Sequence, residues 1–182
     1  MKKRTRMFCV SSLVLAFALA VLGITGCAPT AQDSGAIPAV VPPVVPKEAD
    51  LGSPERAVKS YTDWISFAYR VLDSEVATHT FTPHEEVRVN SYVQYNRIEG
   101  RGIEQFLADA DYEQLKSRGA TATLVGDEFW RYRYFDIEET RYLTGPLEAS
   151  YDVTYTVVRQ TDGRWLVDKV DVNRLDEPAA QE

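Results

Sequence analysis

The sequence predicts an α+β domain whose helices pack on a mainly antiparallel sheet. After residue 52, apolar residues first recur at steps of three and four and then, from Ala120 on, at steps of two. Because the helical patterns precede the strand patterns instead of alternating with them, an α+β fold is favoured over α/β. The region 53–175 is about 120 residues long, which suits a single hydrophobic core.

The first helix has a clear start. Ser53 suits the N-cap, Pro54 the first helical position and Glu55 the positive end of the helix dipole. The apolar stripe that follows predicts a helix to about Val76, with Trp64 on its buried face.

Two shorter helices are expected next. Thr82, Pro83 and Glu85 have the pattern of a capping box, which predicts a helix that fades near residue 100. The spacing of apolar residues over 103–118 predicts a third helix, with Gly119 as its C-terminal cap.

Alternation of apolar and polar residues then predicts three strands, over 121–135, 147–160 and 164–173. A bulge or bend is expected at Gly126. Asp162 and Gly163 indicate a two-residue hairpin, in which paired positions sum to 325. Tyr155 should then face Val170, and a slip by one residue would place it beside a charged side chain.

The same register pairs Arg159 with Leu166 and sets Asp168 opposite Val157, on the apolar face. A carboxylate there must be paired, hydrogen-bonded or protonated, because burying it alone is costly. Two interpretations remain open for Asp168: a satisfied residue near the rim of the fold, or an acid–base group at the base of a pocket.

The order of elements, the stretch 130–134 (Trp-Arg-Tyr-Arg-Tyr) and the closing hairpin at 162–167 resemble bacterial envelope members of the nuclear transport factor 2-like superfamily. The resemblance implies a cone in which helices and a curved sheet enclose a pocket. Its lining would come from six residues: Trp64, Tyr92, Trp130, Tyr132, Tyr155 and Asp168. The superfamily includes enzymes and non-catalytic modules, so the fold alone selects no function.

The first 26 residues have the layout of an export signal. Four basic residues precede an apolar run over 7–22, which is shorter than the roughly 20 residues of a membrane span. The junction Ile-Thr-Gly-Cys at 24–27 resembles a bacterial lipobox, which implies cleavage between Gly26 and Cys27 and attachment of acyl chains such as palmitate to Cys27. The other cysteine, Cys9, lies within the signal, so a disulfide in the mature chain is excluded.

Residues 27–52 carry five of the nine prolines and predict an extended tether between the lipid and the domain. The tail 176–182 is polar and is expected to be disordered. Removing the signal, with its four basic residues, leaves 16 basic against 27 acidic side chains, a net charge of −11. This balance argues against nucleic acid as a partner.

The sequence contains no phosphate-binding loop, zinc-protease motif or nucleophile elbow, and no cofactor is expected. His79 and His84 lack the neighbours of a metal site. We therefore expect a non-catalytic binding or interaction module, anchored on the extracytoplasmic side of a bacterial cell membrane. Its ligand would be an envelope protein, a wall component or a small apolar molecule. The alternatives are a small isomerase- or dehydratase-like enzyme and a structural protein that dimerises through its sheet.

Overall fold

The computed structural model describes residues 39–175, so the predicted signal peptide, Cys27 and the tail 176–182 lie outside the described residues. The chain forms helices first and strands second. The elements are α1 (Pro54–Val71), the 3₁₀-helix η1 (Glu75–Thr80), α2 (Pro83–Ile98), β1 (Arg101–Arg118), β2 (Thr121–Asp136), β3 (Leu147–Arg159) and β4 (Trp165–Arg174). This confirms the predicted α+β class.

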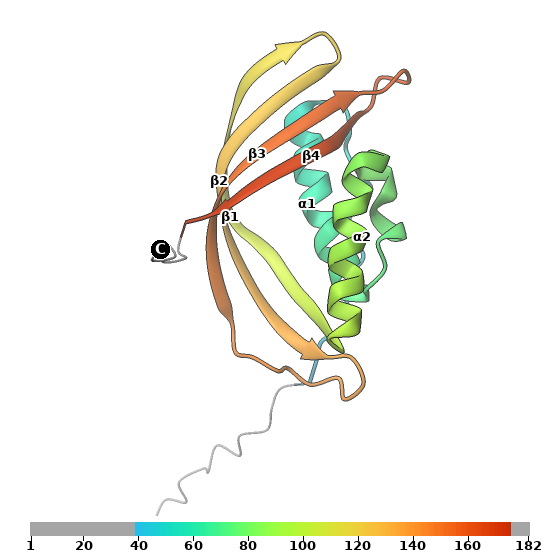
Figure 1. The fold of residues 1–182 in the computed structure, drawn as a ribbon, viewed down its shortest axis with the longest axis vertical. Coiled ribbons are helices and arrows are strands. Elements are labelled where there is room, and N and C mark those ends of the chain that lie inside the picture. Colours follow the sequence, from blue (N-terminus) through green and yellow to red (C-terminus); the bar gives the residue numbers. More distant parts are fainter. Residues whose placement is uncertain (1–38, 176–182) are drawn as a thin grey trace, which may run out of the picture. The chain divides into compact units, whose positions relative to one another are not determined.

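The four strands form one antiparallel sheet in the order β1-β2-β3-β4, so each strand pairs with its neighbours in sequence. The sheet is strongly bent, and its two halves curve toward the side on which α1 and α2 lie (Figure 1). The main core fills the space between them. It contains buried residues from every element, among them Tyr61, Val89, Ile103, Tyr155 and Val167.

Helix α1 begins as predicted but ends five residues early. The Ser53 side chain accepts a hydrogen bond from the backbone N–H of Arg56 at 3.4 Å, and Pro54 occupies the first turn. The helix stops at Val71 because Leu72 takes a left-handed conformation, with φ 55°, while its side chain stays buried. Residues up to Val76 therefore belong to a turn and to η1.

Helix α2 lacks the predicted capping box. The side chain of Thr82 makes no capping hydrogen bond, and its hydroxyl donates instead to Asp168 at 2.7 Å. Glu85 turns into the core, where only 3% of the residue is exposed. The helix start thus rests on Pro83 and on contacts with β4, including a 2.9 Å bond from the Thr82 N–H to the Val167 carbonyl.

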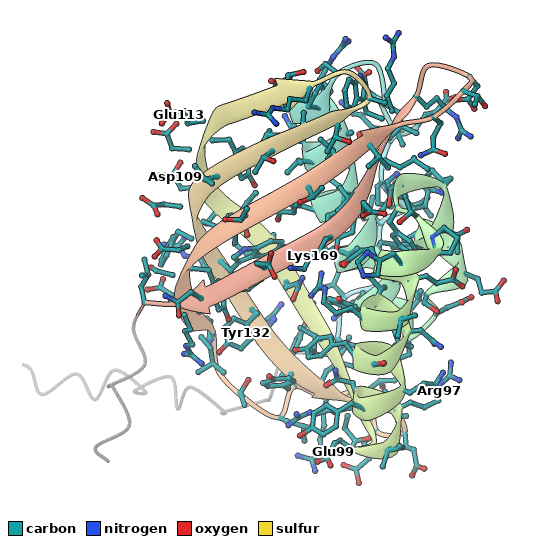
Figure 2. The ribbon with its side chains drawn as sticks, turned by 45° about the horizontal axis from the view of Figure 1, so that its top comes forward. Arg97, Glu99, Asp109, Glu113, Tyr132 and Lys169 are labelled. Atoms are coloured by element: carbon teal, nitrogen blue, oxygen red, sulfur yellow. The ribbon has the colours of Figure 1, made fainter. Side chains whose placement is uncertain are left out.

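The predicted helix over 103–118 is wrong: this segment is strand β1. It pairs with β2 from Arg101 to Arg118, and Gly119 is the first residue of a two-residue hairpin turn, with φ +60°, not a helix cap. Asp109 and Glu113 lie on the side of β1 that points away from the helices (Figure 2). Two irregularities in the ladder, at 107–109 and 114–116, interrupt the alternation of the strand.

The β3–β4 hairpin keeps the predicted pairs Tyr155–Val170 and Val153–Val172. The predicted pair Arg159–Leu166 is wrong, because Arg159 faces Trp165. Residues 161–163 form the loop, with Gly163 at φ +90°, and the Gln160 N–H bonds the Arg164 carbonyl at 2.7 Å. A bulge beside Thr156 absorbs the one-residue difference.

Part of the predicted tether packs on the domain. Ala39 forms a β-bridge with Arg141, and the Trp165 N–H donates to the Leu51 carbonyl at 2.8 Å. Leu51 is buried with Ala57 and Leu166 in a small second core. The folded unit therefore includes residues N-terminal to Ser53. None of the helices within residues 39–175 has the length and apolarity needed to cross a membrane.

Three buried tyrosines make stability sensitive to alkaline pH. Burial raises the pKa of Tyr61 and Tyr155 well above the ordinary value of 10.0, and raises the pKa of Tyr69 to about 12. In the unfolded chain these phenols ionise near pH 10, whereas the folded domain keeps them protonated. Their contribution to stability is thus complete below pH 10 and is lost as the pH rises toward their folded-state pKa values.

We expect the free energy of unfolding to fall above pH 10 by up to about 1.4 kcal/mol per pH unit for each of these tyrosines. Phenolate absorbance and circular dichroism, followed together in an alkaline titration, measure this. The buried phenols should ionise only as the dichroism is lost. Titration of all ten tyrosines near pH 10 with the fold intact would contradict the expectation.

Candidate functional site

The residues predicted to line a pocket do not all lie in one place. Trp130 and Tyr155 are buried, Trp64 and Tyr132 are partly buried against the main core, and Tyr92 is 37% exposed. Several aromatic rings in the core between the sheet and the helices meet edge to face. Tyr155 contacts both Tyr61 and Tyr112 in this way, with ring centroids 6.0 Å apart in each pair.

A buried carboxylate that the sequence analysis missed organises these rings. Glu128 on β2 is 4% exposed and accepts three hydrogen bonds. The Tyr112 and Tyr155 hydroxyls donate to Oε1 at 2.6 and 2.7 Å, and the Trp130 indole donates to Oε2 at 2.7 Å. Burial, and then the Glu128 charge, raise the pKa of both tyrosines. Extending the inward alternation of Trp130 and Tyr132 back by one step would have identified Glu128.

A second carboxylate holds the helices together beside this cluster. Glu85 accepts hydrogen bonds from the Tyr61 hydroxyl at 2.5 Å and from Nε of Arg88 at 2.7 Å. Arg88 also bonds the Tyr61 oxygen. Glu85 thus joins α2 to α1, and Glu128 joins β2 to the two strands beside it.

Asp168 lies at the rim, at the start of α2. The bulge in β4 pairs Val157 with Val167, so Asp168 does not stand opposite Val157 as predicted. Its side chain is 30% exposed and accepts a 2.7 Å hydrogen bond from the Thr82 hydroxyl. His84 approaches it at 3.4 Å from the solvent side. These contacts favour the interpretation of a satisfied carboxylate.

A cleft of about 720 Å³ lies on another part of the domain, beneath residues 41–47, which we call the strap. The strap is fastened at both ends. The Arg70 guanidinium donates to the Val41 carbonyl, and the Trp64 indole donates to the Lys47 carbonyl at 3.2 Å. Between these points the strap passes over α1 and β1, which supply the cleft floor: Lys59, Asp63, Ser66, Phe67, Arg70, Glu104, Gln105, Phe106 and Leu107.

One end of the cleft is closed by an ion cluster. Glu104 pairs with Arg70 and Arg133, each at 2.7 Å, and accepts a 2.6 Å hydrogen bond from Tyr142. Although burial opposes it, the Tyr142 and Arg133 hydrogen bonds and the arginine charges lower the pKa of Glu104. This end is therefore a fixed wall in which two arginines share one carboxylate.

The rest of the cleft combines apolar surface with two lysines and a few polar side chains, Asp63, Ser66 and Gln105. Val44, Phe106 and the strap prolines supply the apolar surface, and Val44 is 85% exposed. The ammonium groups of Lys47 and Lys59 form no ion pair with any residue between 39 and 175. Asp63 lies one helical turn from Lys59, and burial raises the pKa of its carboxyl despite that lysine. The lining suits an amphipathic ligand of modest size.

The described part of the chain, residues 39–175, has no group of three or more histidine, cysteine or acidic side chains placed to hold a metal ion. The protein is thus an α+β domain with helices on one side of a bent antiparallel sheet. A cleft covered by the strap lies at the edge of that sheet.

No protein-family model matches the sequence, and no curated protein matches it significantly. Among solved structures, the intermembrane-space region of the chloroplast protein ARC6 is similar in fold, with a TM-score of 0.57 at 13% identity, over 71% of this chain and 100% of that one. A nuclear transport factor 2-like superfamily protein from Salmonella enterica serovar Typhimurium has a TM-score of 0.47 at 7% identity, over 71% and 99% of the two chains. A nuclear transport factor 2-like family protein from Streptomyces avermitilis has a TM-score of 0.46 at 16% identity, over 69% of this chain and 100% of that one. At these identities the likeness is one of fold.

Proposed function

We propose that this chain is a lipid-anchored, extracytoplasmic binding protein whose domain takes a ligand in the cleft beneath the strap and has no catalytic role. The observation that carries the binding role is the cleft itself: it has a volume of about 720 Å³, is apolar over much of its lining and is bordered by two lysines that have no ion-pair partner among residues 39–175. Pockets of about 300–1,000 Å³ with a few placed polar groups are typical ligand sites.

The interior of the domain favours binding over acid–base catalysis. A general base must be free to reach a substrate proton. Glu128 already accepts three hydrogen bonds, and Glu85 is held by Tyr61 and Arg88. Asp168 is engaged by Thr82 at the rim. The carboxylates of the interior therefore support the fold, and the accessible chemistry lies at the cleft.

The anchor rests on the sequence around Cys27. A charged and apolar leader ends in Ile-Thr-Gly-Cys, which resembles the bacterial lipobox. From Cys27 to Ala39 the chain advances 12 residues, which span at most about 40 Å when extended. The tether proposed here is thus shorter than the whole stretch 27–52, because residues 39–51 pack on the domain.

Replacing Cys27 with serine tests the anchor. In a bacterial host, the native chain should incorporate labelled palmitate and partition into the membrane fraction, since two or three acyl chains hold a protein firmly. Cys27→Ser should abolish the label and leave the membrane fraction depleted by at least about tenfold. Cys9→Ser is the matched control, because Cys9 precedes the cleavage site, and it should behave as the native chain does. Mass spectrometry showing an unmodified Cys27 would disprove the anchor.

A further inference from the structure

The cleft exposes an unpaired strand edge. β1 is at the edge of the sheet and pairs only with β2 among residues 39–175. Within that range, no backbone hydrogen bond joins the outer edge of β1 to another segment. Residues 104–107 of this strand line the cleft. Proteins normally cover such edges, because unpaired N–H and C=O groups invite another strand.

The cleft, which we call the channel, lies between the strap on one side and α1 and β1 on the other. The strap forms one side and is fixed at Val41 and Lys47, six residues apart. Its three prolines restrict it to extended conformations, so it spans on the order of 19 Å. An extended segment of about six residues, rising ~3.3 Å per residue, matches this length.

The charges in the channel select among extended segments. The lining carries three basic and two acidic side chains, Lys47, Lys59 and Arg70 against Asp63 and Glu104, in a chain whose net charge is −7. Arg70 is already paired with Glu104. Lys47 and Lys59 then face a single remaining carboxylate, Asp63, so the lining keeps one net positive charge for an anionic group. Phe67, Phe106 and the strap valines offer apolar contact.

We infer that the cleft binds an extended segment of a partner protein, and that this segment pairs with the outer edge of β1. The segment has apolar side chains and at least one acidic residue. Backbone pairing with Gln105 and its neighbours supplies affinity, and the apolar and lysine contacts supply specificity. The inference rests on the proposed binding function and names its ligand class. An apolar small molecule is the competing ligand.

A random heptapeptide library displayed on phage, selected against the intact lipoprotein in detergent, provides the probe. We expect the selected peptides to be enriched in apolar residues with at least one acidic residue. Bound to the protein, such a peptide should slow hydrogen exchange by about tenfold or more for those amides within 104–107 whose N–H groups point away from β2, because only those groups become newly paired.

Phe106→Glu should weaken binding of the selected peptide by at least tenfold, because it places a negative charge in the channel. Val172→Glu is the matched control: Val172 is on β4, the other edge strand, and is 50% exposed where Phe106 is 54% exposed. It should change binding by less than about twofold.

Three results would overturn the inference: no enrichment by the library, equal binding to Phe106→Glu, or binding without protection of 104–107. In another outcome, no peptide is enriched, and the protein binds decanoate at a saturable site that Phe106→Glu abolishes. This result would disprove the peptide ligand but would agree with the proposed binding function. Membrane release of Cys27→Ser is measured separately. Failure of the proposed anchor can therefore be distinguished from failure of the peptide ligand and from failure of the proposed binding function.

Discussion

Replacing Glu128 with alanine is expected to lower the free energy of unfolding by about 3–6 kcal/mol. The change removes the acceptor of three hydrogen bonds and leaves the Tyr112 and Tyr155 hydroxyls and the Trp130 indole without it. Each unsatisfied buried donor costs roughly 1–3 kcal/mol. Since small domains are stable by only about 5–15 kcal/mol, much of the fold's margin depends on this one carboxylate.

Urea midpoints measure the effect, and two further variants define its cause. Glu128→Gln keeps the shape of the side chain and one acceptor oxygen. Its free energy of unfolding should therefore lie between those of Glu128→Ala and the native protein. Glu138→Ala removes an exposed glutamate from the loop after β2 and should change stability by less than about 0.5 kcal/mol. If Glu128→Ala and Glu138→Ala had the same midpoint, the buried network would not stabilise the domain.

Local patterns in the sequence were sufficient for much of this fold. The start of α1 follows from Ser53 and Pro54, whose effects act within one helical turn. The β3–β4 hairpin follows from a turn with Gly163 and from apolar residues that must share a face. The pairs Tyr155–Val170 and Val153–Val172 survive the longer loop because the bulge in β4 restores the register beyond it.

β1 was missed because its sequence does not carry the period of a strand. Two ladder irregularities shift the alternation, and its many Glu, Gln, Ala and Leu residues are good helix formers. The strand forms through non-local pairing with β2, and tertiary contacts override weak local preference. The error had a consequence for the site, since Tyr112, a donor to Glu128, lies on β1.

The strap was missed for a different reason. Its prolines and valines have the composition of a spacer, and composition does not reveal that Arg70 and Trp64 bind its carbonyl groups. Asp168 shows the same limit on a smaller scale. Its position depends on a one-residue bulge, which turns it toward Thr82 and away from the interior.

Gly126→Ala is expected to cost about 3 kcal/mol or more, at the upper end for overpacking. A bulge or bend was predicted at this glycine, and its regular pairing with Tyr112 and Val153 excludes the bulge. A Cβ added there would lie 2.1 Å from the Asp111 carbonyl oxygen and 2.7 Å from Cδ1 of Tyr112. The carbonyl belongs to the backbone of the neighbouring strand, so relief requires β1 and β2 to separate.

Gly145→Ala is the matched control for this change, because a Cβ at Gly145 has no atom within 4 Å and should be tolerated within about 1 kcal/mol. The two variants would be compared by urea unfolding and by hydrogen exchange of the β1 amides. Separation of the strands in Gly126→Ala would also move Tyr112 away from Glu128. Amide hydrogen exchange around Tyr112 should therefore be faster in this variant. The losses of stability caused by Gly126→Ala and Glu128→Gln should also be non-additive when the two changes are combined. Equal midpoints for the two glycine variants would show that the close approach of β1 to Gly126 does not constrain the sheet.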